Sequence, residues 1–333
     1  MLRILSMDGG GIRGIIPLTW LMALEERTGQ RTSDLFDLVV GTSAGGMAAL
    51  ALVSARQGAG PYTAEEVRQL NLDSAAEIFP ERAAVAGAER PAGGEAAGTP
   101  LYPPEPLQHY LREALGDAPL SAAVRPVAVT TCDLVDTEAL YFAGGGLEQD
   151  VLGDAPMALA AQATASLPRY FPPVDFTDPE GRARQLVDGG LAADDPALLG
   201  YALGTALPAA ADGVVLVSLG TGTSSGAPGA GLRLGAEQTQ QTPELQALGR
   251  DLSMVLSGPG QLARDCLRLV LADRYLRIQT DLLPAASNAS DDAAASNLQG
   301  LIRTAEKMVQ VTSGELDRLA RLLSEGQGPW RAG

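Results

Sequence analysis

The chain has 333 residues, of which 46% are hydrophobic and only 4% aromatic, so it can bury a large core that aliphatic side chains must fill. Its formal net charge of −16 at pH 7 excludes the basic surface that binding of a nucleic-acid polymer requires. Two cysteines, Cys132 and Cys266, are too few for a disulfide framework or a zinc site. No apolar run of about 18 residues predicts a membrane span, and the first residues lack the pattern of a secretory signal, so we expect a cytoplasmic protein.

The N-terminal elements follow the order strand, turn and helix, twice in succession. Each unit has a short apolar run, a cluster of glycines and then a longer segment rich in Ala, Leu or Ile. In chain order these elements are expected at 4–7 (strand), 8–14 (turn), 15–26 (helix), 35–40 (strand), 41–45 (turn) and 46–56 (helix).

The middle of the chain contains a segment of different composition. Residues 83–106 are rich in Ala, Gly, Pro and Glu without periodicity, which predicts a flexible surface loop or lid. Alternating strands and helices predict an α/β fold with helices on both faces of a sheet, and we expect one domain over 1–333. The later elements are expected at 107–115 (helix), 126–132 and 139–142 (strand pair), 155–166 (helix), 185–188 and 214–219 (strands), and then a mostly helical remainder with polar loops at 223–231 and 284–297.

The second turn has the pattern of a nucleophile elbow. Gly41-Thr42-Ser43-Ala44-Gly45 lies between a predicted strand and a predicted helix. Such a turn needs a strained backbone at the serine, and the glycines on either side remove steric clashes. The serine hydroxyl is then presented at a helix N-terminus, whose dipole favours developing negative charge. Ser43 is therefore the candidate nucleophile, and a plain tight turn is the alternative.

The first turn, at 8–14, allows two interpretations. Its bare glycine amides could form an oxyanion hole for a tetrahedral intermediate, with added positive charge from an arginine. Its glycine spacing also fits a dinucleotide fingerprint, which would suggest a nicotinamide-dependent oxidoreductase. That alternative needs an acidic residue about twenty positions on at the end of a strand, and none is found there. The oxyanion interpretation therefore takes precedence, with the candidate residues Gly9, Gly10, Gly11 and Arg13.

A serine nucleophile needs a base, and the sequence offers two candidates. His109 is the single histidine, but it lies within an apparently amphipathic helix and precedes the best acidic residue in the chain, so we expect a surface side chain. Asp188 ends an apolar strand and is followed by Gly189 and Gly190, which allow close approach of another segment. A carboxylate base is thus the prediction.

Together, Asp-Gly-Gly-Gly-Ile-Arg-Gly at 8–14, Gly-Thr-Ser-Ala-Gly at 41–45 and Asp-Gly-Gly at 188–190 resemble the patatin-like phospholipases. Supporting segments at 165–172 and 218–222 extend the resemblance from residue 2 to about residue 222. The resemblance implies a three-layer α/β/α fold with a mixed central sheet, no metal and no cofactor. It also implies hydrolysis of acyl esters in phospholipids or other lipids, with peripheral contact at the inner membrane surface. The site residues that it implies are Ser43 and Asp188 as the catalytic dyad, Gly9, Gly10, Gly11 and Arg13 as the oxyanion hole, and Gly14, Gly41, Gly45, Gly189 and Gly190 as motif glycines.

One departure from the family pattern lies close to the predicted base. Such proteins often carry Asn-Asn-Pro after Asp-Gly-Gly, whereas this chain has Asp194-Asp195-Pro196. Two extra carboxylates near the site argue against a preference for substrates with anionic head groups. Two alternatives remain open beside a constitutive lipid hydrolase: a regulated effector phospholipase switched on by a nucleotide signal or a partner, and a non-catalytic module that binds a lipid or a nucleotide.

Overall fold

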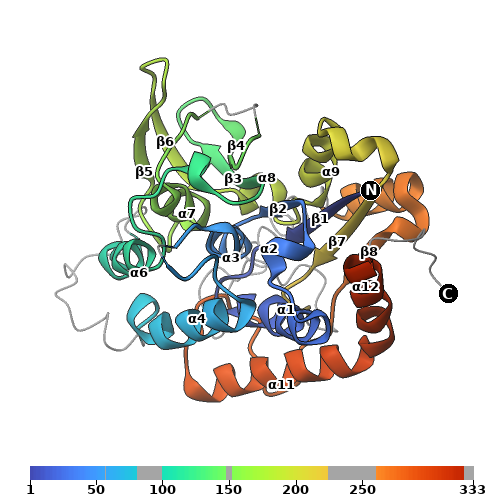
Figure 1. The fold of residues 1–333 in the computed structure, drawn as a ribbon. Helices are drawn as coiled ribbons and strands as arrows, with labels where there is room; N and C mark the ends of the chain where they lie inside the picture. The colour runs from blue at the N-terminus through green and yellow to red at the C-terminus, as the bar shows by residue number, and fades with distance from the viewer. Residues whose placement is uncertain (57, 81–99, 148–151, 224–259, 326–333) are drawn as a thin grey trace.

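The computed structural model describes residues 1–56, 58–80, 100–147, 152–223 and 260–325. A mixed eight-stranded sheet forms its centre, in the order β5-β6-β3-β2-β1-β7-β8, with β4 paired to β3 (Figure 1). Neighbours from β3 to β8 along this order are parallel, while β4 and β6 run antiparallel to β3, and β5 antiparallel to β6. The strands are β1 (Leu2–Met7), β2 (Leu38–Gly41), β3 (Val127–Asp133), β4 (Glu138–Gly144), β5 (Val174–Thr177), β6 (Ala183–Asp188), β7 (Val214–Leu219) and β8 (Tyr275–Ile278).

Helices cover both faces of this sheet, and the larger layer is the one that contains α1 and α11 (Figure 1). The smaller layer on the other face consists of α9 and the helical residues 260–271. No helix in the described part of the chain has the length and apolar character to cross a bilayer. The other helices of the described residues are η1 (Gly11–Gly14), α1 (Ile15–Thr28), α2 (Thr32–Leu35), α3 (Ala44–Val53), α4 (Ala64–Ile78), α6 (Glu105–Leu115), η2 (Leu120–Ala122), α7 (Met157–Ala165), α8 (Gly190–Ala193), α9 (Ala197–Thr205), η3 (Pro208–Asp212), η4 (Ala272–Arg274), α11 (Ala295–Val311) and α12 (Ser313–Glu325).

The two cores follow from the alternation of side chains along the strands. In β1, Leu5 and Met7 point into the larger helical layer, while Leu2 and Ile4 point into the smaller one. All four side chains are buried, as expected for a central strand covered on both faces. The predicted α/β class and the three-layer arrangement with a mixed sheet are therefore confirmed.

Several element boundaries differ from the sequence-based expectation. The strand expected at 35–40 is shorter because residues 32–35 form α2, whose first amide and Thr32 hydroxyl both donate to Glu25 of α1 at 2.7 Å. The helix expected at 46–56 begins at Ala44 and ends at Val53. Strand β8 interrupts the C-terminal part that was expected to be mostly helical.

The predicted loop or lid at 83–106 is described only in part. Residues 83–99 lie outside the described residues. Helix α6 begins at Glu105, so the last two residues of the expected loop are helical, with a proline in the first turn where its missing N–H costs nothing.

Candidate active site

Strand β3 brings the two candidate catalytic residues together. One edge of β3 pairs with β4 along residues 127–133, so β2 and β6 must share the other edge. Strand β2 ends opposite Val129, and β6 approaches from the other direction and ends opposite Thr131. The turn after β2 and the last residue of β6 therefore meet, and they carry Ser43 and Asp188.

Ser43 occupies the strained backbone conformation that a nucleophile elbow requires. Its φ is 55° and its ψ is −124°, a region that residues with a side chain seldom adopt. The Ser43 amide donates to Thr164 Oγ1 at 2.9 Å, which holds the turn against α7. A side chain on Gly45 would lie 2.4 Å from the carbonyl oxygen of Met7, so only glycine lets α3 begin this close to β1.

The Asp188 carboxylate is fully engaged and removed from water. Its Oδ2 accepts a hydrogen bond from Ser43 Oγ at 2.6 Å, and its Oδ1 accepts one from the Gly190 amide at 2.7 Å. Only 2% of the residue is exposed. This burial raises the pKa of Asp188 to about 7, although the two hydrogen bonds oppose the rise. The carboxyl group is therefore suited to exchange a proton near neutral pH.

The glycine turn leaves two amides free of protein acceptors. The Gly9 amide donates to the Asp194 carbonyl at 3.0 Å, and the Ile12 amide donates to the Ser290 carbonyl at 2.9 Å. In the described part of the chain, no acceptor is recorded for the amides of Gly10 and Gly11. Gly11 has a φ of +55°, and a Cβ there would lie 2.1 Å from the Ser290 oxygen. Of the three predicted glycine donors, only Gly10 and Gly11 are thus free to bind an oxyanion.

Arg13 stabilises this turn through side-chain hydrogen bonds. Its guanidinium donates to the Gly10 carbonyl at 3.3 Å, to the Gly222 carbonyl at 3.0 Å and to Asn288 Oδ1 at 3.1 Å. The residue is 8% exposed, and this burial lowers its pKa. These bonds use three of its five N–H donors, those on Nε and Nη1, and hold the guanidinium against the turn.

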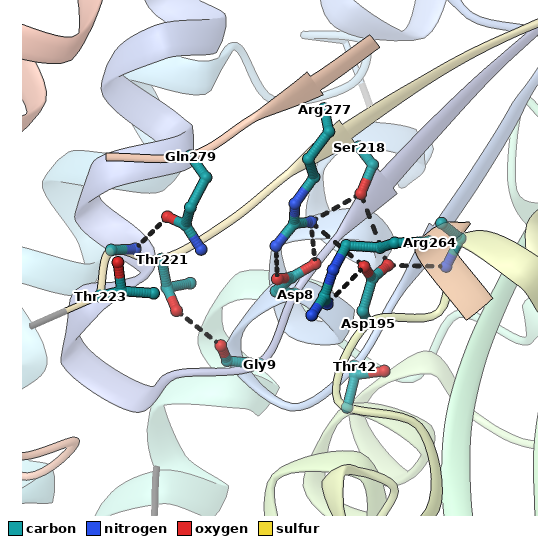
Figure 2. Close-up of polar contacts among 12 residues, drawn as sticks. Asp8, Gly9, Thr42, Asp195, Ser218, Thr221, Thr223, Arg264, Arg277 and Gln279 are labelled. Carbon is teal, nitrogen blue, oxygen red and sulfur yellow. Dashed lines mark hydrogen bonds and ion pairs between the residues drawn. The ribbon is translucent and has the colours of Figure 1, made fainter. Parts of the chain in front are cut away.

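A network of buried charges lies behind the glycine turn (Figure 2). Arg277 of β8 makes a bidentate ion pair with Asp8, with Nη1 at 2.7 Å from Asp8 Oδ1, and also donates to Ser218 Oγ at 2.7 Å. Asp195 accepts from Arg264 at 3.2 Å and lies 3.4 Å from Arg277. Burial raises the pKa of Asp8 to about 7 against the opposing effect of Arg277. Sequence reasoning missed both arginines because no motif surrounds them.

An apolar pocket opens beside Ser43 and Gly11. Its cavity volume is about 50 Å³, within a hollow of about 520 Å³ that includes open solvent. Helix α4 forms one wall, although the sequence analysis did not identify that helix. The capping box Thr63-x-x-Glu66 at its start could have shown it, since the two residues exchange side-chain hydrogen bonds with each other's amides. The apolar lining includes Met47, Ile78, Phe79, Leu107 and Phe171.

His109 does not belong to this constellation. It lies on α6 with 66% of its side chain exposed, and its Nε2 atom is 3.4 Å from Glu113. The structure thus brings Ser43, Asp188, Gly10 and Gly11 together and places the histidine on the surface, as the sequence analysis expected.

Comparisons with known proteins match this chain to patatins and patatin-like proteins. The family model described as "Patatin-like phospholipase" matches residues 5–201. The chain is 29% identical over 362 residues to "Probable inactive patatin-3-Kuras 1" of Solanum tuberosum, covering 98% of this chain and 93% of the relative. It is 28% identical over 363 residues to "Patatin-T5" of the same plant, covering 98% and 90%. It is 29% identical over 343 residues to "Patatin-like protein 2" of Arabidopsis thaliana, covering 93% and 83%.

A comparison with solved structures gives a more distant likeness. VipD from Legionella pneumophila aligns with 93% of this chain and 67% of its own length, with a TM-score of 0.37 and 12% identity.

Proposed function

This chain belongs to the patatin-like phospholipase family, and on that premise we propose that it is a lipid acyl hydrolase in which Ser43 is the nucleophile and Asp188 the general base. The observation that carries the proposal is the 2.6 Å hydrogen bond from Ser43 Oγ to a buried carboxylate, made from a strained turn at a helix N-terminus. A hydroxyl needs such a base because its own pKa is far above neutral pH.

The proposed reaction has two halves. Asp188 Oδ2 takes the proton from Ser43 Oγ as the oxygen attacks the acyl carbonyl carbon, and the amides of Gly10 and Gly11 donate to the resulting oxyanion. Each such donor typically contributes roughly 3 kcal/mol to stabilising the transition state. The intermediate then collapses, and the leaving alcohol receives the proton from Asp188. In the second half Asp188 deprotonates a water that attacks the acyl-enzyme carbonyl. The bond from the acyl carbon to Ser43 Oγ then breaks, the proton passes from Asp188 to Ser43 Oγ, and the fatty acid is released.

The apolar pocket beside Ser43 is proposed to hold the acyl chain. Its apolar walls, including Ile78 and Phe171, suit a hydrocarbon, and it begins at the serine and the glycine turn. An acyl carbonyl next to Ser43 and Gly11 would direct its hydrocarbon tail into this space.

The proposal also covers where the enzyme acts in the cell and how much of the chain forms the catalytic domain. We place the enzyme in the cytoplasm, acting on lipid at the inner membrane surface, because Cys132 and Cys266 are both free thiols. The whole chain is proposed to act as one catalytic domain. Strand β8 pairs with β7 in the central sheet, and α11 and α12 pack against α1, so the C-terminal part shares the core of the motif-bearing part.

The test is labelling with a fluorophosphonate probe, followed by mass spectrometry of the products released from mixed phospholipids, galactolipids and short acyl esters. Wild type should be labelled at Ser43 and should release fatty acid. Ser43→Ala should lose both labelling and turnover, while Asp188→Asn should lose at least a hundredfold in turnover with its fold intact. His109→Ala is the matched control. A folded wild type that is neither labelled nor active would favour the non-catalytic binding module.

A further inference from the structure

Asp194 is a carboxylate in the site to which the proposed reaction gives no role. It follows α8, and its backbone carbonyl accepts the Gly9 amide. Its side chain, in contrast, has no hydrogen bond and no ion pair within the described residues. The residue remains exposed, whereas Asp188 and Asp195 on either side of it in sequence are buried.

The Asp194 carboxylate lies close to the glycine turn and to the dyad. A Cβ placed on Gly9 would lie 2.5 Å from Asp194 Oδ1 and 3.3 Å from Ser43 Cβ, so both atoms border the same small space. A Cβ placed on Gly190 would lie 3.0 Å from Asp188 Oδ1 and 3.6 Å from Asp194 Oδ1. Asp194 therefore lies next to the dyad, and its residue is exposed whereas Asp188 is buried.

The two sides of Ser43 differ in chemistry. None of the described residues that line the apolar pocket comes from the segment 188–195, so Asp194 lies outside the proposed acyl site. If the acyl chain occupies that pocket, the leaving alcohol extends toward Asp194.

The nearby cations do not neutralise this carboxylate by contact. Arg13 is held by three acceptors, Arg277 by Asp8 and Arg264 by Asp195. Although the residue is exposed, desolvation by nearby protein atoms raises the pKa of the Asp194 carboxyl, while the charge of Arg13 opposes the rise. Within the described residues, each of these three guanidinium groups is thus held by another acceptor, and none forms an ion pair with Asp194.

We propose that Asp194 selects substrates whose leaving alcohol is uncharged and carries hydroxyl groups, such as a glycosyl glycerol, over alcohols that carry a phosphate beside the scissile ester. A carboxylate with free lone pairs accepts hydrogen bonds from hydroxyls. The same carboxylate repels a phosphate at short range, where only partial screening by solvent occurs. This inference rests on the proposed function and names the substrate class of the same site.

The test compares three lipids with identical octanoyl chains: monogalactosyl diacylglycerol, phosphatidylcholine and phosphatidylglycerol. Each is presented at the same mole fraction in neutral detergent micelles at pH 8.5, where Asp188 is ionised. The measured quantity is kcat/KM for the galactolipid divided by kcat/KM for each phospholipid. Ratios cancel any change in the dyad that affects all substrates alike.

Wild type should prefer the galactolipid, and Asp194→Asn should lower both ratios about tenfold, as expected when one repulsive charge and one acceptor site are lost. The Asn side chain leaves the backbone carbonyl for Gly9 in place, and Asp194→Glu should retain the preference because it retains the charge. Asp212→Asn is the matched control because it removes the same bulk charge from a carboxylate that is 84% exposed. Asp212 adjoins the start of β7, whereas the glycine turn contacts Thr221 after the end of that strand.

Three results would overturn the inference. Ratios that are unchanged in Asp194→Asn would leave the residue without a role in selection. A wild-type preference for phosphatidylcholine that disappears in Asp194→Asn would mean that the carboxylate recognises a cation instead. An equal change in Asp212→Asn would assign the effect to bulk charge. A wild type that releases no fatty acid from any lipid and is not labelled at Ser43 would refute the proposed function itself.

Discussion

The buried Asp188 carboxylate should lower the stability of the protein when it is ionised, and Asp188→Asn should remove this effect. An asparagine fits the site because its oxygen can accept from the Gly190 amide and its amino group can donate to Ser43 Oγ. The variant removes a buried ionisable group without opening a cavity. We therefore expect it to be inactive and, at high pH, more stable than wild type.

The magnitude follows from the pKa of Asp188, which burial raises from 3.8 to about 7. A carboxyl with a raised native pKa binds its proton more tightly in the folded state. Its contribution to stability is therefore present at low pH and is lost as the pH rises through 7. Between pH 5.5 and 8.5 the loss amounts to about 2 kcal/mol, at about 1.4 kcal/mol per pH unit between 5.5 and 7. Asparagine does not titrate, so the variant keeps this stability.

The assay is urea unfolding of wild type and Asp188→Asn at pH 5.5 and 8.5 and constant ionic strength. The free energy of unfolding of the variant relative to wild type should increase by about 2 kcal/mol between the two values of pH. The lower pH stays above the pI near 4.5, where a protein without net charge precipitates. Asp212→Asn, which changes an exposed carboxylate, should show no such increase. A constant or decreasing difference for Asp188→Asn would refute the reasoning, because it would mean that the native carboxyl is ionised throughout.

Further predictions concern catalysis and packing. The kcat/KM for a soluble acyl ester should fall about tenfold per pH unit below about 7, since the base Asp188 must be ionised; a flat profile down to pH 5 would exclude it. His109→Ala should keep kcat/KM within about threefold of wild type, and a thousandfold loss in a folded variant would contradict the dyad. Arg13→Ala should lower kcat more than it raises KM, because Arg13 holds the turn that is proposed to bind the oxyanion; a change in KM alone would assign Arg13 to substrate binding. Gly45→Ala should destabilise the protein by about 1–3 kcal/mol in urea unfolding, because its Cβ would meet backbone atoms of β1.

Local signals in the sequence account for the parts of the site that were predicted. The elbow at Ser43 and the strand end at Asp188 each depend on a few neighbouring residues, so the glycine patterns suffice to locate them. The contact between the two side chains depends on β3 pairing with both β2 and β6 along one edge, and no local pattern encodes that order of strands. From the sequence alone, only the resemblance to a family indicates that Ser43 and Asp188 act together.

The missed residues have a common physical reason. Arg264 and Arg277 lie in the C-terminal part, and each acts through a partner more than sixty positions away in the chain. Arginine has no local signature when its role is to neutralise a distant buried carboxylate. The engagement of the Gly9 amide by the Asp194 carbonyl is of the same kind, since a free amide and a bonded one have the same sequence.

The ion pair between Asp8 and Arg277 limits how this enzyme can be divided or recombined. A fragment ending at residue 201 would contain the three motifs at 8–14, 41–45 and 188–190, yet it would leave Asp8 as a buried charge without its counterion. Such an orphaned charge costs several kcal/mol, so the fragment should not keep its glycine turn in place. A chimera with a related protein should therefore take both the turn at 8–14 and strand β8 from the same parent, so that Asp8 keeps its counterion.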